Sequence, residues 1–255
     1  MIPYFPQPSV YLGPFHIYAW GVLAAVNALV AFYMIVRRAM VRGISGEEMF
    51  RFCFTMFATG IIGAHLASAI MDNPSRFLAH PMIALLSAGI RSLGGVLVGF
   101  LGGLAWCRLA HLSLFETLRR FDIVLYPIPF AWMFGRLGCF LAHDHRGFFT
   151  TSWIAVNFPE GPRYDLGLIE FLFLILLALV FYLLDRRPRP VGFFIGLYGV
   201  VYGGFRIWLD TLHVEPLRFG GWAVVVAIGL LCWAISYRQV RRRQPFQQTS
   251  AAPTT

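Results

Sequence analysis

Two arginines lie inside long apolar segments of this 255-residue chain. Arg136 follows Ala-Trp-Met-Phe-Gly, and Arg206 stands in Tyr202-Gly-Gly-Phe-Arg206-Ile-Trp-Leu-Asp210. An arginine inside a bilayer costs at least about 2.5–3.5 kcal/mol, so such residues are typical of functional sites. The planar guanidinium donates two hydrogen bonds to one oxyanion, which suits phosphate. We therefore predict an anion site at these two arginines. The alternative is snorkelling to an interface, or a structural ion pair with Asp210 or Asp144.

Polar residues follow Arg136 closely, in the order Cys139, His143, Asp144 and His145. Asp144 comes eight residues after Arg136, so the two would share one face of a continuous helix. The two histidines are two residues apart, which does not place both on one helical face. No third ligand is evident, so we predict neither a metal site nor a cofactor.

A second polar pattern surrounds Arg206. Tyr198, Tyr202, Arg206 and Asp210 are spaced by four residues, which predicts one stripe on a helix. Glu170 is a lone acid near the start of another apolar segment. It either pairs with one of the arginines or lies at a membrane interface.

Composition restricts the class of protein. Hydrophobic residues make up 58% of the chain and charged residues 13%, against about 45–50% and 25% in soluble domains. This excludes soluble enzymes and nucleic-acid-binding proteins, although the net charge is +9. We predict an all-α membrane protein, with residues 1–240 as one domain and 241–255 as a disordered cytoplasmic tail. Its expected spans are 17–36, 52–71, 93–110, 121–141 (kinked by Pro127 and Pro129), 166–184, 191–209 and 221–237.

The arginines also predict the topology. Fourteen of the 21 basic residues, all of them arginines, follow the first, third, fifth and seventh spans, whereas five lie in the other connections. Positive residues concentrate on the cytoplasmic side. We therefore predict a periplasmic N-terminus and a cytoplasmic C-terminus.

Glycines are frequent between residues 94 and 103. They do not form the spacing of a nucleotide-binding phosphate loop. Gly95, Gly99 and Gly103 instead predict a face for close helix packing.

Several of these motifs together resemble the prolipoprotein diacylglyceryl transferase family. Gly135-Arg136-Leu-Gly138-Cys139-Phe140, followed by Asp144 and Gly147, is similar to its signature Gly-Arg-x-Gly-Asn-Phe with a later acid and glycine. Further similarities cover the stripe of Tyr198, Tyr202, Arg206 and Asp210, the run Gly94-Gly95-Val-Leu-Val-Gly99, Glu170, and Tyr18-Ala-Trp20-Gly21.

The resemblance implies a multi-pass enzyme of the bacterial inner membrane. Such enzymes transfer the diacylglyceryl group of phosphatidylglycerol to the lipobox cysteine of a preprolipoprotein, which forms a thioether and releases glycerol phosphate. The implied catalytic residues are Arg136, Arg206, Asp144 and Tyr202. The implied substrate-binding residues also include Gly94, Gly95, Gly138, Cys139, Gly147, Glu170, Tyr198, Asp210 and Trp20.

The sequence departs from the family pattern at several positions. Leu93 replaces a histidine, Cys139 an asparagine, Asp144 a glutamate and His213 a second arginine. His143 or His145 is a candidate replacement base. Two alternative functions follow: a catalytically silent relative that binds lipid or lipoprotein, and a small anion transporter.

Overall fold

The computed structural model describes residues 1–72, 74–89, 91–214 and 220–248. Arg218, counted above among the outer arginines, and residues 249–255 of the expected tail lie outside these ranges. The chain forms two compact units: one combines Met1–Ile35 with the residues from Phe121 on, and the other is Val36–Arg120. Each unit is described separately.

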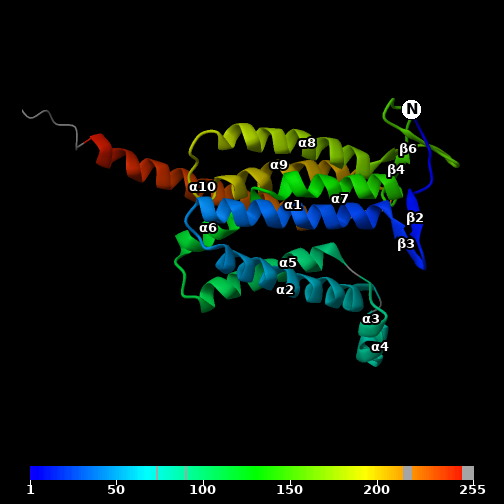
Figure 1. Cartoon of the computed structure of the whole chain (residues 1–255), viewed down its shortest axis with the longest axis horizontal. Helices are drawn as coiled ribbons and strands as arrows, with labels where there is room; N and C mark the ends of the chain where they lie inside the picture. The colour runs from blue at the N-terminus through cyan, green and yellow to red at the C-terminus, as the bar shows by residue number, and fades with distance from the viewer. Residues whose placement is uncertain (73, 90, 215–219, 249–255) are drawn as a thin grey trace, which may run out of the picture. The chain divides into compact units, whose positions relative to one another are not determined.

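Helices stand at each of the seven expected spans (Figure 1). The expected spans correspond to α1 (Ala19–Val41), α2 (Gly46–Asp72), α5 (Ser92–Leu109), α6 (Leu114–Leu125) with α7 (Ile128–Ala142), α8 (Leu166–Asp185), α9 (Phe193–Asp210) and α10 (Gly220–Gln248). Two short helices, α3 (Pro74–Ala79) and α4 (Pro81–Leu86), separate α2 from α5. The last helix thus extends past residue 240, into the segment expected to be disordered.

The fourth expected span is broken, because proline cannot continue a helical hydrogen-bond ladder. Pro127 and Pro129 stand at the break, and α6 and α7 are bent by 40°. Within the described residues, α1, α2 and α8 are each long and apolar enough to cross a membrane, and the bent pair is a fourth candidate. The protein is therefore a helical membrane protein, with three to four candidate spans by length and composition among its described residues.

Two small sheets add strands to the expected all-α fold. Strands β2 (Ser9–Leu12) and β3 (Phe15–Tyr18) form an antiparallel hairpin. The second sheet has the order β1-β5-β6-β4, with β1 (Ile2–Pro3) parallel to β5 (Val156–Phe158). β6 (Gly161–Asp165) pairs antiparallel with β5 and with β4 (Arg146–Phe149). This sheet organises the connection between α7 and α8.

Apolar side chains of α8 and α9 form the core of the first unit. Leu174, Leu177 and Phe181 of α8 pack with Phe194 and Leu197 of α9 and with Tyr126 and Tyr202. The buried Asp122 adds a polar anchor, because its Oδ1 accepts hydrogen bonds from the backbone N–H groups of Phe194 (2.9 Å) and Ile195 (3.2 Å). A carboxylate at a helix N-terminus accepts hydrogen bonds from backbone N–H groups that have no partner within the helix, and its negative charge interacts favourably with the helix dipole.

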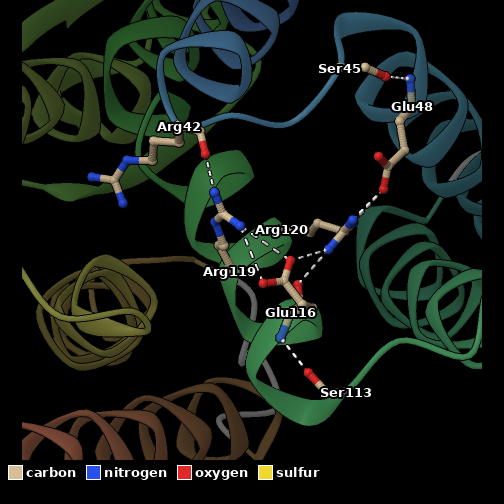
Figure 2. Close-up of polar contacts among 7 residues, drawn as sticks. All are labelled: Arg42, Ser45, Glu48, Ser113, Glu116, Arg119 and Arg120. Atoms are coloured by element: carbon tan, nitrogen blue, oxygen red, sulfur yellow. Dashed lines mark hydrogen bonds and ion pairs between the residues drawn. The ribbon is translucent and has the colours of Figure 1, made fainter.

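The second unit is held by close helix packing and by an ion network. Gly60 and Ala64 of α2 lie against Gly95 of α5, and Gly60 also lies against Gly99, which confirms the predicted packing face at those two α5 glycines. Figure 2 shows the network, in which the buried Arg120 binds both Glu48 and Glu116. Arg120 Nη1 lies 2.9 Å from Glu116 Oε2. Ser45 and Ser113 cap the helices that carry the two acids. Arg119 adds a bond to the Arg42 carbonyl.

Candidate active site

Glu170 is the centre of the polar cluster in the first unit. It lies in the second turn of α8, and its side chain is only 1% exposed. The Tyr202 hydroxyl donates to Oε1 at 2.6 Å, and Arg206 Nη1 donates to Oε2 at 2.6 Å. Arg136 Nε lies 2.9 Å from Oε1. The Glu170 carboxylate of α8 thus contacts side chains of both α7 and α9, and it pairs with both arginines.

The predicted stripe on α9 is confirmed by its contacts. Tyr198 stacks on Tyr202 with ring centroids 4.7 Å apart, and Arg206 Nη2 lies 3.0 Å from Asp210 Oδ1. Tyr198 therefore supports the tyrosine that binds Glu170. Asp210 pairs with Nη2 of Arg206, whereas Glu170 pairs with Nη1.

The charges of this cluster cancel: two arginines face two carboxylates. The arginine side chains are 13% and 15% exposed, and the guanidinium groups lie 5.4 Å from the Trp132 ring centre and 5.1 Å from that of Trp222. Arg206 Nε makes no hydrogen bond within the described part of the chain. The pairs therefore hold both guanidinium groups in place while leaving donor capacity for an anion.

The C-terminal end of α7 differs from the sequence expectation. The helix ends at Ala142, and His143 takes a left-handed conformation with φ 52°. Asp144 therefore does not continue the helical face of Arg136, as the eight-residue spacing suggested. Its N–H instead bonds back to the Cys139 carbonyl at 3.4 Å.

His143 is buried and points to Asp165. Its Nδ1 lies 2.7 Å from Asp165 Oδ2, and the rings of Tyr4, Phe5, Phe140 and Phe158 surround the imidazole. Asp165 also caps α8 by accepting from the Leu168 N–H at 3.2 Å. Burial raises the pKa of Asp165, and the bonds from His143 and Leu168 oppose that rise. This pair therefore joins the ends of α7 and α8.

Cys139, Asp144 and His145 converge beside Arg136. Their ligand-type atoms lie within 4.8 Å of one another, and Arg136 Nη1 is 3.9 Å from Cys139 Sγ. Desolvation lowers the pKa of His145, which favours its neutral form. A cavity of about 270 Å³ opens next to this group and is lined by Gln7, Tyr18, Trp20, Ala142 and Asp144.

Two predicted glycines position this region by close contact. A Cβ on Gly138 would lie 3.3 Å from Trp20 Cδ1, so the glycine lets α1 approach α7. A Cβ on Gly147 would lie 2.9 Å from the Leu212 carbonyl oxygen. The close pairing of β4 with the segment after α9 brings His213 near His145, with ring centroids 6.1 Å apart.

Gly94 and Gly95 belong to the other compact unit. A Cβ on Gly94 would lie 2.3 Å from Ala67 Cβ, and one on Gly95 would lie 3.1 Å from Ala64 Cβ. Both glycines are therefore covered by α2, and their part in substrate binding stays a prediction. The side chain of Leu93 lies outside the described residues.

The sequence did not predict the contacts of Asp165 with His143 and Leu168, nor the convergence of Asp144 and His145 on Cys139. The signal for Asp165 was available, because an aspartate directly before a long apolar run is typical of a helix N-cap. The position of Cys139 depends on the backbone reversal at His143, which spacing alone does not predict.

Comparison with known proteins adds a family. A family model described as prolipoprotein diacylglyceryl transferase matches residues 8–240. A phosphatidylglycerol–prolipoprotein diacylglyceryl transferase from Sodalis glossinidius is 27% identical, with 96% of this chain and 98% of the relative covered. Proteins of the same name from Actinobacillus pleuropneumoniae serotype 3 (30% identical; 83% and 84% covered) and Clostridium tetani (25%; 78% and 82%) are also similar. Since the match spans nearly the whole chain, including both arginines, this protein belongs to the prolipoprotein diacylglyceryl transferase family.

Proposed function

We propose that this chain transfers the diacylglyceryl group of phosphatidylglycerol to the lipobox cysteine thiol of preprolipoproteins. The observation that carries the proposal is the convergence of Arg136 and Arg206 on the buried Glu170. Two oriented guanidinium groups in an apolar setting suit a phosphodiester. They also stabilise the negative charge that develops on the phosphate group as glycerol phosphate leaves. The names of the similar proteins support the same reaction.

The reaction forms one bond and breaks one. The acceptor sulfur, as a thiolate, attacks the glyceryl carbon that carries the phosphate. The C–O bond to the phosphate breaks, and its electron pair leaves with glycerol phosphate, held by Arg136 and Arg206. Glu170, Asp210 and Tyr202 act as positioning residues in this proposal, because they contact the arginines or one another.

The same proposal includes the membrane arrangement. We place the enzyme in the bacterial inner membrane with seven spans, the fourth formed by α6 and α7, and with the N-terminus periplasmic and the C-terminus cytoplasmic. The distribution of arginines among the connections supports this orientation. The outer end of α7 then faces the side from which the lipobox peptide arrives.

Purified protein with phosphatidylglycerol vesicles and a lipobox peptide tests the activity. We expect transfer by the unmodified chain and its loss in Arg136→Ala and Arg206→Ala. Arg51→Ala is the matched control, because Arg51 is an exposed partner of Glu47 in the other unit and its loss should leave transfer unchanged. Full activity of either site variant overturns the assigned roles. Lipid binding without transfer by the unmodified chain identifies a silent relative, and solute flux in proteoliposomes identifies a transporter.

A further inference from the structure

Three side chains at the outer end of α7 form the ligand set of a thiophilic metal. Cys139 offers a sulfur, Asp144 a carboxylate oxygen and His145 an imidazole nitrogen, all within 4.8 Å of one another. We propose that Cys139, Asp144 and His145 bind a Zn²⁺ ion, and that this ion holds the acceptor cysteine as a thiolate. The second clause rests on the proposed function, whereas the first does not.

The backbone brings the three ligands together. On a continuous helix, residues 139, 144 and 145 would be spread around the axis, because they are five and six positions apart. The left-handed conformation of His143 reverses the chain, and the Asp144 N–H bonds to the Cys139 carbonyl at 3.4 Å. Asp144 and His145 thereby fold back over the last helical turn, with His145 Nε2 3.8 Å from Asp144 Oδ1.

This grouping replaces the sequence-based expectation of no metal. That expectation considered His143 and His145 as the ligand pair. His143 is instead buried against Asp165, and Cys139 supplies the ligand that the sequence did not reveal. Cys139 and Asp144 are also positions where this chain departs from the family signature.

The donor set favours zinc over harder cations. Thiolate and imidazole ligands suit Zn²⁺, whereas Mg²⁺ and Ca²⁺ prefer oxygen ligands. Ligand atoms of a tetrahedral zinc lie about 3.5 Å apart, so the three atoms, which now lie within 4.8 Å of one another, must approach by about 1 Å when zinc binds. The charges also fit: the Cys139 thiolate and Asp144 neutralise the ion, while Glu170 and Asp210 balance Arg136 and Arg206.

Three protein ligands leave one tetrahedral position open, as in catalytic zinc sites. The cavity lined by Asp144, Trp20 and Tyr18 adjoins the Asp144 ligand and gives a peptide thiol room to approach the cluster. A thiol that coordinates zinc loses its proton, here to solvent at the exposed Asp144. The thiolate then attacks as described above, close to Arg136, whose Nη1 is 3.9 Å from Cys139 Sγ.

Metal binding by the full-length protein in detergent tests the site without an activity readout. After chelation and dialysis, Zn²⁺ is titrated and bound metal is measured by mass spectrometry; Co²⁺ then serves as a spectroscopic probe. We expect one Zn²⁺ per chain and a cobalt–thiolate charge-transfer band. Cys139→Asn and His145→Ala should weaken zinc binding more than about tenfold, and Cys139→Asn should remove the thiolate band.

Matched controls use residues of the same types away from the cluster. Cys53→Ser and His16→Ala should bind zinc like the unmodified chain, because Cys53 lies in the other unit and His16 bonds to Ser9 on the hairpin. Cys139→Ser tests whether a failure of Cys139→Asn reflects folding, with gel filtration and thermal unfolding as checks. Zinc binding that is absent, or unchanged in correctly folded Cys139 variants, overturns the site.

Transfer assays separate the two claims. If the chelated enzyme loses transfer and Zn²⁺ restores it, the ion acts on the acceptor thiol as proposed. If transfer continues unchanged after chelation, the thiolate role is wrong and the proposed function stands. If zinc binds as expected and no transfer occurs, the metal site stands and the proposed function is wrong.

Discussion

The carboxylate of Glu170 bridges two arginines on different helices: Oε1 lies 2.9 Å from Arg136 Nε, and Oε2 accepts from Arg206 Nη1 at 2.6 Å. Glu170 is buried, so each of its oxygens depends on these partners. The relationship makes α8 the element that fixes the spacing of the two guanidinium groups. Changes at Glu170 therefore affect both arginines at once.

Glu170→Gln should lower both stability and transfer. Removing one partner of a buried ion pair costs about 3–5 kcal/mol because the other charges stay buried. Thermal unfolding in detergent and the vesicle transfer assay measure the two effects. Glu160→Gln is the control, since Glu160 is half exposed and pairs only at the surface with Arg146 at 2.7 Å; its effect on stability should stay below about 1 kcal/mol. A Glu170→Gln variant as stable as this control contradicts the bridging role.

Tyr202→Phe should reduce transfer without unfolding the protein. The change removes only the hydroxyl that donates to Glu170 at 2.6 Å and keeps the ring that stacks on Tyr198. Loss of a hydrogen bond to a charged group costs about 1.5–3 kcal/mol. Steady-state kinetics should show the loss mainly in kcat, because the tyrosine acts through Glu170. Tyr182→Phe, whose hydroxyl meets the exposed Arg186 at 3.5 Å, should behave like the unmodified chain.

Gly94→Ala should destabilise the second unit. The added Cβ would lie 2.3 Å from Ala67 Cβ and 2.7 Å from the Gly63 carbonyl oxygen, so α2 and α5 must move apart. Such overpacking costs about 1–3 kcal/mol. Gly204→Ala is the helical control, since nothing lies within 4 Å of its added Cβ. It should stabilise α9 by up to about 1 kcal/mol, and equal melting temperatures for both variants would contradict the packing argument.

Asp165→Ala should lower stability more than Asp165→Asn. Alanine removes both the α8 cap on the Leu168 N–H and the bond to His143, whereas asparagine still caps the helix through its amide oxygen. Thermal unfolding of both variants measures the difference, which we expect to be about 1 kcal/mol. A reversed order would show that the cap contributes nothing. Glu47→Gln, on an exposed i,i+4 pair with Arg51, provides the surface control.

Periodicity predicted the helices well, because long apolar runs interrupted by arginines and prolines leave few alternatives in a membrane. The four-residue spacing from Tyr198 to Asp210 likewise predicted a shared face, and α9 confirms it. Contacts between segments distant in sequence were less predictable. For Glu170 the sequence left two alternatives, pairing with one of the arginines or an interfacial position, and the structure shows pairing with both arginines.

Periodicity and residue spacing did not predict the backbone reversal or the short strands. No residue pattern around His143 marks a left-handed end to α7, since glycine or asparagine is the usual residue there. The spacing argument for Asp144 therefore failed, and Cys139 was not recognised as its neighbour. The strands between α7 and α8 are only three to five residues long, too short for an alternating pattern to stand out.

The balance of two arginines against two carboxylates has a consequence for product release. A phosphodiester lipid brings one negative charge into a neutral cluster. The phosphate monoester that departs carries about −1.5 to −2 at pH 7. In the proposed reaction, Glu170 and Asp210 repel that additional charge, because both contact Arg206. We therefore expect the same acids that orient the arginines for the lipid to favour dissociation of the product and to limit product inhibition during repeated turnover.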